Sequence, residues 1–305
     1  RNRWARYGLS AALITLVLIK VQPQHVARAV GTARPDYLLL ALVLTLPFLY
    51  LKTARWYLLL RSARIESTFP EAAASLLGGM GLALLTPARL GELARVAYLR
   101  DSQKWKAGGL VMIDKGLDVL VLAILSVAGA WTLLGKPAGC GMAVVALAGL
   151  TVVYNPRRVH LTLEKMSAPF PLRSRLSQVW TSLESLSTGS TSLFLLLTLL
   201  SFVCVLAQFG LILLSWRSWS PDVVFLTFPL VILTNVLPIT IGGLGVREGA
   251  AALLLAHYGV SAADAALAAF LMFAMNTALP GLVGAMLLPA SGPPSAQPVG
   301  SLDHT

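Results

Sequence analysis

Long apolar runs separated by short polar segments dominate this chain. Lipid offers the peptide backbone no hydrogen-bond partners, and a helix needs about 20 apolar residues to cross a hydrocarbon layer about 30 Å thick. The runs are continuous and do not alternate between apolar and polar positions, which favours helices over a transmembrane barrel. We predict six full spans, near Trp4–Val21, Tyr37–Leu60, Gly108–Leu134, Ala138–Tyr154, Ser192–Trp216 and Ala262–Leu288.

Two further apolar stretches, near 73–100 and 221–258, are interrupted at their middle by proline, glycine and charged residues. Proline removes a backbone donor and glycine frees the dihedral angles, so each break needs partners inside the protein or in a wet cavity. The pattern therefore predicts two re-entrant helical hairpins. The breaking residues are Pro87 and Gly91 in the first hairpin, and Pro238, Gly242, Gly243 and Gly245 in the second.

The two hairpins carry related patterns, which indicates an inverted repeat. Inverted repeats in transporters place broken helices around a site near the middle of the membrane. Two unrelated kinked helices remain the alternative interpretation. The matching sets are Pro87, Gly91, Glu92 and Arg95 against Pro238, Gly243, Arg247 and Glu248. We expect an all-α, polytopic integral membrane protein, with one transmembrane domain over residues 1–289 and a disordered tail over 290–305.

Composition and charge agree with a membrane protein. Apolar residues make up 56% of the chain and charged residues 12%, with a mean hydropathy of +0.75. The net charge of +11 comes from Lys and Arg scattered between apolar runs, so no basic domain for nucleic acid is expected. Most of these cations lie in segments on the same side of the membrane as the N-terminus. The positive-inside rule therefore predicts the cell inner membrane with both termini cytoplasmic. The basic segment 155–190 is expected to lie along anionic headgroups as an amphipathic linker.

Ionisable groups at membrane depth are costly and are therefore the candidates for a functional site. Arg89, Glu92 and Arg95 are three residues apart, which places them on one helix face. Arg247 and Glu248 follow the glycines of the second hairpin. Backbone N–H groups at that helix start, together with an arginine, form a natural anion pocket.

A third cluster contains Asp114, Lys115 and Asp118. Positive partners for the two acids are Lys115, or Arg89 and Arg95 across the fold. These charges could simply neutralise one another and lock the hairpins, which is the structural alternative. Lys52, Arg55 and Trp56 are interpreted as snorkelling and interfacial anchors at the end of the second span. No metal-ligand spacing, cofactor motif or disulfide framework is found.

The segments LTPARLGELARVAYLR and LPITIGGLGVREGAAALL resemble the two signature regions of the lysylphosphatidylglycerol synthase transmembrane-domain family. That family includes the flippase-type membrane domain of the multiple peptide resistance factor and also stand-alone proteins. Ala54-Arg55-Trp56 and Met112-Ile113-Asp114-Lys115 with Asp118 extend the resemblance over nearly the whole chain. Two positions depart from the family, which often has arginine at Lys115 and near Asn276.

The resemblance implies translocation of lipids with anionic or modified headgroups. We expect a flippase or scramblase for a phosphate-headed lipid, such as an aminoacylated phospholipid or a polyprenyl-phosphate-linked sugar, and no catalytic residues. Arg89, Arg95 and Arg247 would bind the phosphate, while Glu92, Asp114, Asp118 and Glu248 act as cavity acids or ion-pair partners. The alternatives are an integral membrane enzyme acting on a lipid-linked phosphate and a proton- or ion-coupled solute antiporter. Further candidate partners are a second copy of the chain and a separate lipid-modifying enzyme.

Overall fold

The computed structural model describes residues 31, 33–84, 86, 90–99, 104–165, 180, 183–184, 186–236 and 245–286. These residues form helices, and no strand occurs among them. Within the described part, five helical stretches are long and apolar enough to cross a membrane: Pro35–Ser62, Lys106–Leu134, Lys136–Tyr154, Thr188–Leu214 and Ala262–Met286. The all-α, multi-pass class is confirmed, and these stretches coincide with five of the six predicted spans. The predicted span near Trp4–Val21 and the tail 290–305 lie outside the described residues.

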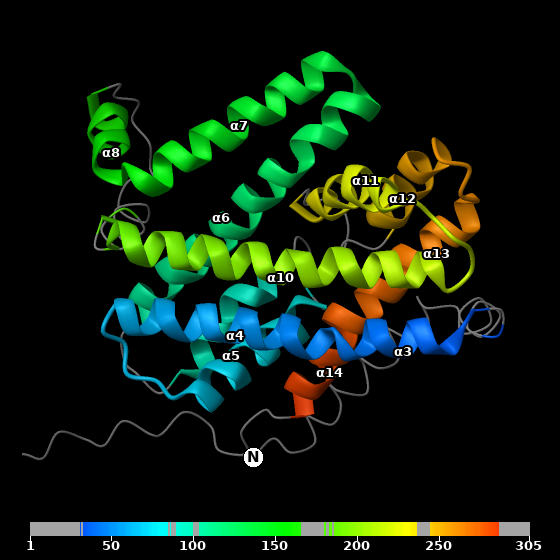
Figure 1. Ribbon diagram of the computed structural model, residues 1–305. Coiled ribbons are helices and arrows are strands. Elements are labelled where there is room, and N and C mark those ends of the chain that lie inside the picture. The colour runs from blue at the N-terminus through cyan, green and yellow to red at the C-terminus, as the bar shows by residue number, and fades with distance from the viewer. Residues whose placement is uncertain are drawn as a thin grey trace, which may run out of the picture.

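The first described span and a later one lie side by side and antiparallel (Figure 1). The first consists of α3 (Pro35–Val43) and α4 (Thr45–Ser62), which meet at Leu44, a residue whose own dihedral angles are helical. The other is α10 (Thr188–Leu214). Gln208 Nε2 donates to the Ala41 carbonyl at 2.8 Å, so the register is set by a buried polar contact near one end of the pair.

The predicted hairpin over 73–100 folds as two tightly packed antiparallel arms. The first arm is α5 (Phe69–Ala83) and the second is η1 (Leu90–Tyr98), a 3₁₀ helix. Glycines permit the close approach: a Cβ built on Gly79 would lie 2.8 Å from the Cβ of Arg95, and one on Gly91 would lie 2.2 Å from the backbone of Leu82. Whether the hairpin is re-entrant in a bilayer stays a prediction, and its breaking residue Pro87 lies outside the described residues.

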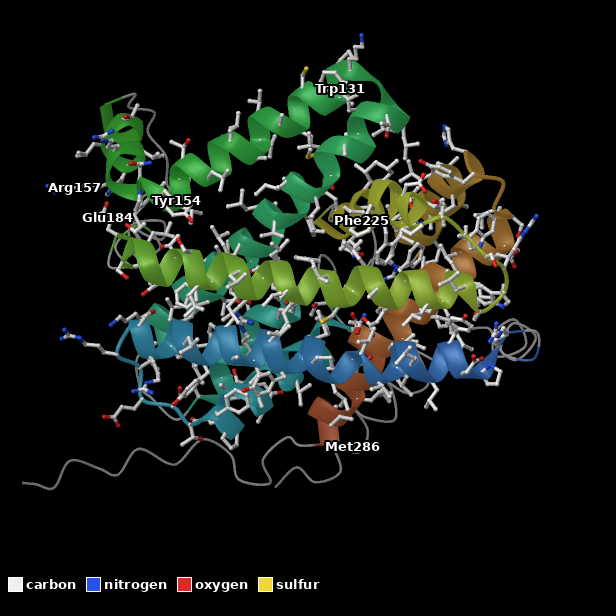
Figure 2. The ribbon with its side chains drawn as sticks, in the orientation of Figure 1. Trp131, Tyr154, Arg157, Glu184, Phe225 and Met286 are labelled. Carbon is white, nitrogen blue, oxygen red and sulfur yellow. The ribbon has the colours of Figure 1, made fainter. Side chains whose placement is uncertain are left out.

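Two consecutive spans pack as an antiparallel pair. The first is α6 (Lys104–Gly129), which continues as the π-helix η2 (Ala130–Leu134), and the second is α7 (Lys136–Tyr154). Gly135 makes the turn with φ of +97°, a conformation that side chains disfavour. Exposed Trp131 and Tyr154 lie at opposite ends of α7, as Figure 2 shows. A helix of 19 residues is about 27 Å long, close to the hydrocarbon thickness, so these two aromatics suit the two interfaces.

After α7 comes α8 (Pro156–Lys165), the helix near the start of the predicted amphipathic linker 155–190. Arg157 and Glu184 lie near Tyr154 at the same end of the molecule (Figure 2). The His160 ring stacks on Trp180 with centroids 5.4 Å apart, and its Nδ1 lies 3.0 Å from the Glu184 carboxylate. Contact of this segment with headgroups stays a prediction.

The remaining helices are α11 (Pro221–Leu233), η3 (Thr234–Val236), α12 (Val246–Ala256), α13 (Ala262–Phe273), the π-helix η4 (Ala274–Ala278) and α14 (Leu279–Met286). The helices α11 and α12 pack on one another as arms of the second predicted hairpin. Residues 237–244 between them, including Pro238, Gly242 and Gly243, lie outside the described residues, so the inverted repeat stays a prediction. Pro280 lacks an N–H for the Asn276 carbonyl, and the π-helix that precedes it accommodates this lost bond.

The last span is locked to the first hairpin through glycine. A Cβ on Gly81 would lie 2.7 Å from the Gly281 carbonyl oxygen, and one on Gly284 would lie 2.1 Å from the Leu77 carbonyl oxygen. Small residues allow such backbone contact between membrane helices, where close van der Waals packing drives association. The helix α5 therefore packs tightly between α14 and η1, the helix that carries Glu92 and Arg95.

Candidate functional site

The guanidinium of Arg55 is the centre of a buried group of charges. Arg55 lies on α4 and is 1% exposed. Its two terminal nitrogens lie 2.7 Å from Asp114 and 2.8 Å from Asp118, and it also donates to the Thr198 hydroxyl. The two acids are one turn apart on α6 and so present both carboxylates to α4. Arg55 therefore connects α4, α6 and α10 in the interior of the molecule.

Arg95 brings the first hairpin into the same group. It donates to the second oxygen of Asp114 at 2.9 Å, and its guanidinium lies 3.8 Å from the centre of the Trp56 ring. Trp56 Nε1 donates to the Ser75 hydroxyl, which in turn donates to the Arg95 carbonyl at 2.9 Å. Stacking on an aromatic face and pairing with a carboxylate are the interactions for which arginine is suited. The first arm of the hairpin is thereby tied to α4, and the second arm to α4 and α6.

Two described lysines also belong to the group. Lys52 Nζ lies 2.6 Å from Asp118, and Lys115 pairs with Glu92 while lying 3.8 Å from Asp118. Side chains three residues apart share a face in a 3₁₀ helix, so Glu92 and Arg95 both reach α6. We call this set the ion-pair network. Its members are Lys52, Arg55, Arg95 and Lys115 with Glu92, Asp114 and Asp118, which gives four positive and three negative charges.

A second charged pair begins the second arm of the other hairpin. Gly245, with φ of +92°, precedes α12, and its N–H donates to Glu248 Oε2 at 2.6 Å. The other oxygen of Glu248 accepts from Arg247, whose guanidinium lies 4.8 Å from the centre of the Phe273 ring. Glu248 thus satisfies one of the N–H groups that a helix start leaves unpaired, and its charge favours the helix dipole.

An apolar cluster relates the two hairpins in space. Leu84, the residue after α5, packs in one cluster with Phe270 and Phe273 of α13. Because Arg247 lies on the ring of Phe273, the described ends of the two hairpins meet at this cluster. The tips themselves, at Pro87 and at 237–244, lie outside the described residues, so their predicted approach stays a prediction.

Three uncharged polar side chains form a chain of hydrogen bonds in the interior of the bundle. Asn276, in the π-helix η4, donates to Gln208 Oε1 at 2.8 Å, and Gln208 Nε2 donates to Thr45 Oγ1 at 3.0 Å. All three side chains are buried. At this point of the last span an amide thus bonds to another amide, and the span is joined to α10 and α4 without a charge.

Several sequence expectations have a direct outcome in this geometry. Lys115 and Arg95 were both expected as partners of the two acids, and the structure pairs Arg95 with Asp114 and Lys115 with Asp118. The interpretation of Lys52, Arg55 and Trp56 as interfacial anchors is wrong, because a snorkelling cation keeps its head in water, whereas Arg55 and Trp56 are buried and Lys52 is paired with Asp118. Arg89 lies outside the described residues.

A charge count along the spans could have found Arg55. Two acids one turn apart in one apolar span need two cations at the same depth, and Lys52 and Arg55 are the cations inside the neighbouring span. On local grounds alone, the motif Ala54-Arg55-Trp56 near the end of an apolar run favours an interfacial position. Chemically, the arrangement holds cations in water-poor surroundings, where they bind carboxylates and where an anionic headgroup could compete for them.

Comparison with known proteins identifies the family of the chain. Residues 3–284 match the family model described as the lysylphosphatidylglycerol synthase TM region. A UPF0104 membrane protein of Methanothermobacter thermautotrophicus (strain Delta H) is 34% identical over 127 residues, which is 39% of this chain and 37% of that relative. The aligned part thus spans little more than a third of the relative. Because the family match covers nearly all of the sequence, the chain belongs to the lysylphosphatidylglycerol synthase transmembrane-region family.

Proposed function

We propose that this protein moves a lipid with a phosphate-containing headgroup between the two leaflets of a membrane, as a flippase or scramblase. The observation that carries the proposal is the ion-pair network, which places seven charged groups inside a bundle of apolar spans. Charges at membrane depth are rarely retained for stability alone, since an apolar replacement of similar shape is often as stable. Membership of a family named after the membrane region of a lipid synthase supports a lipid as the substrate.

The way in which the hairpins are held also supports transport. The second arm of the first hairpin meets α6 through Arg95 with Asp114 and through Glu92 with Lys115. Ion pairs can exchange partners with an incoming anion, whereas apolar contacts between helices cannot. A phosphate that competes for these cations would loosen the contact between η1 and α6 and let the headgroup pass, while the acyl or prenyl chains stay in the bilayer.

Arg247 is the phosphate ligand that we propose on the second hairpin. It lies in the first turn of α12, where the backbone N–H groups and the helix dipole favour an anion. Its planar fork can bind two phosphate oxygens and keeps its proton. Glu248 holds this fork through one oxygen and the N–H of Gly245 through the other, so the arginine is oriented before a lipid arrives.

Arg95 and Arg89 remain proposed ligands of the phosphate. Arg95 would reach a phosphate only after releasing Asp114, since it is 1% exposed. We propose an aminoacylated phospholipid or a polyprenyl-phosphate-linked sugar as the class of lipid, and the cell inner membrane as the location. A lipid-modifying enzyme on a separate chain would supply such a substrate.

Reconstitution tests the proposal directly. The protein is placed in vesicles that contain phosphatidylglycerol and a trace of its fluorescent analogue, and a membrane-impermeant reductant then reports how much analogue reaches the outer leaflet. We expect faster exchange than in protein-free vesicles. Arg247→Ala should reduce the rate far more than it reduces folded yield, and Arg247→Lys should recover part of it, because a lysine lacks the fork.

The exposed Arg217 provides the matched control, since Arg217→Ala removes an equal charge from the segment before α11. Its transport rate should equal that of the unaltered protein. Equal losses of folded protein and of transport in Arg247→Ala would contradict the role of Arg247 as a phosphate ligand. Vesicles with no exchange for any phosphate-headed lipid, but with proton-coupled uptake of a solute, would favour the antiporter instead.

A further inference from the structure

Lys115 occupies an unusual place on the surface of the bundle. It lies on α6, nine residues after Lys106, where the candidate span begins. A span of 29 residues is about 42 Å long, so Lys115 lies about 7 Å from its middle and within the hydrocarbon layer. Its side chain is nevertheless 38% exposed, whereas that of Arg55 is 1% exposed. The ion-pair network therefore reaches accessible surface at Lys115.

This lysine does not behave as a snorkelling residue. A snorkelling side chain turns towards the nearer interface, which for Lys115 is the end of the span at Lys106. Its ammonium instead pairs with Glu92 and lies 3.8 Å from Asp118, which is almost one turn farther into the span. The amine is thus held at depth by the protein, at a point where the membrane surrounds the helices.

The surface around Lys115 is apolar. Met112, one turn earlier on α6, is 51% exposed, and Leu93, next to Glu92 on η1, is 40% exposed. Gly116 is exposed as well, and a Cβ built on it would meet nothing within 4 Å. A cation framed by apolar side chains and an open glycine matches a lipid, which brings a phosphate and hydrocarbon chains together.

The charge of the network points to an anion. Among the described residues, its four cations and three carboxylates leave one positive charge in excess, and the network reaches the surface at the half-exposed Lys115. An uncompensated charge in hydrocarbon costs several kcal/mol, so a counter-ion from the bilayer is favoured there. Anionic phospholipids supply that charge as a phosphate, at low additional cost because they already lie in the membrane.

We propose that Lys115, at the surface between η1 and α6, binds the phosphate of an anionic lipid that approaches sideways from the bilayer. The inference rests on the proposed function and specifies where its substrate first contacts the protein. Glu92 holds the lysine before the lipid arrives, and the phosphate competes with this carboxylate. Lipid binding therefore weakens the link between η1 and α6, which is the contact that the transport step must open.

Equilibrium binding in detergent tests this site without any transport. The purified protein in a neutral detergent is titrated with dioleoyl phosphatidylglycerol, and bound lipid is counted by native mass spectrometry. Lys115→Ala should weaken binding about tenfold or more, the effect of losing a hydrogen bond to a charged group. Glu92→Gln should tighten binding several-fold, because the competing carboxylate is lost. Dioleoylglycerol, which has the same chains and no phosphate, should bind equally weakly to all variants.

A double variant distinguishes a loss of lipid binding from a folding defect. Lys115→Ala leaves Glu92 without this partner, whereas Lys115→Ala with Glu92→Gln removes one charge of each sign. The double variant should fold as the unaltered protein does and still bind the phospholipid about tenfold more weakly. Lys136→Ala is the matched control, because this exposed lysine begins α7 at an end of the span, and its binding should stay within about twofold.

Two results would overturn the inference. One is unchanged phosphatidylglycerol binding in the double variant, which would leave Lys115 as a structural ion-pair partner. The other is displacement of phosphatidylglycerol by glycerol 3-phosphate at equal concentration, which would identify a water-filled anion site rather than a lipid site. The proposed function fails separately: vesicles without lipid exchange, together with Lys115-dependent binding, would refute transport and leave the lipid site in place.

Discussion

Replacing Arg55 with alanine removes the side chain that joins three spans. The change leaves Asp114 with Arg95 and Asp118 with its two lysines, but it deletes two ion pairs of 2.7 and 2.8 Å and the bond to Thr198. Breaking a buried pair by removing one partner costs about 3–5 kcal/mol, since the two carboxylates then lose part of the attraction that offsets their burial. We expect Arg55→Ala to lower the free energy of unfolding by that amount.

The size of the expected shift in melting temperature follows from the length of the chain. A loss of 1 kcal/mol lowers the midpoint by about 2 °C in a domain of 250 residues or more, so 3–5 kcal/mol corresponds to about 6–10 °C. The assay heats the detergent-solubilised protein and measures the fraction that remains monodisperse on size exclusion. Arg61→Ala is the control, because this exposed arginine lies on the same helix and its loss should cost under about 1 kcal/mol.

A double-mutant cycle separates the ion pair from the loss of packing. If Arg55 and Asp118 interact as the structure shows, the two single replacements by alanine should together cost more than the double replacement, by about 0.5–3 kcal/mol. Equal melting temperatures for Arg55→Ala and Arg61→Ala would refute the reasoning. Strict additivity in the cycle would show that the pair between Arg55 and Asp118 contributes nothing to stability.

Three further changes test other contacts. Gly284→Ala should abolish folded protein, because its Cβ would lie 2.1 Å from a carbonyl oxygen of α5, whereas Gly249→Ala has open space and should be neutral or slightly stabilising; yield on size exclusion compares them. Asn276→Leu should cost about 1–3 kcal/mol by leaving the Gln208 amide oxygen unpaired, and adding Gln208→Leu should cost less than the sum of the two. Glu248→Gln should bind anionic lipid at least as well but move it more slowly in vesicles, because the arginine site then gains positive charge and releases the phosphate less readily.

Opposite results would refute these expectations individually. Folded Gly284→Ala at normal yield would mean that α5 and α14 do not touch through their backbones. An additive cost in the pair at Asn276 and Gln208 would mean that the two amides do not share a hydrogen bond. A Glu248→Gln variant with normal binding and a normal rate would leave Glu248 as a helix cap only.

The spans were predictable because the bilayer imposes one simple requirement. A run of about 20 apolar residues satisfies its own backbone only as a helix, so five spans could be located from hydropathy. The break in 73–100 was predictable for the same reason, since glycine, proline and charges cannot continue a lipid-facing helix. The 3₁₀ conformation of the second arm was not predictable from the sequence. It depends on close packing between this nine-residue helix and α5, at Gly79 of α5 and Gly91 of η1.

The partners of the charges were harder to predict than their existence. Sequence spacing identifies neighbours on one helix, such as Asp114 and Asp118, but says nothing about which span faces them. Arg55 meets both acids because α4 and α6 pack at this depth, a consequence of the whole bundle. Its position near the end of an apolar run favoured the interface on local grounds, and the tertiary structure overrode that preference.

The glycine contact between α5 and α14 constrains the order in which the protein can assemble. Gly81 and Gly281, whose backbones touch, are 200 positions apart in the chain. At about 5–20 residues per second, a ribosome needs about 10–40 s to synthesise the intervening sequence. During that interval the first hairpin has no final span to rest against, and its glycine surface faces lipid or other early helices. Hairpin placement is therefore a late event in biogenesis, completed only when the last helix leaves the translocation machinery.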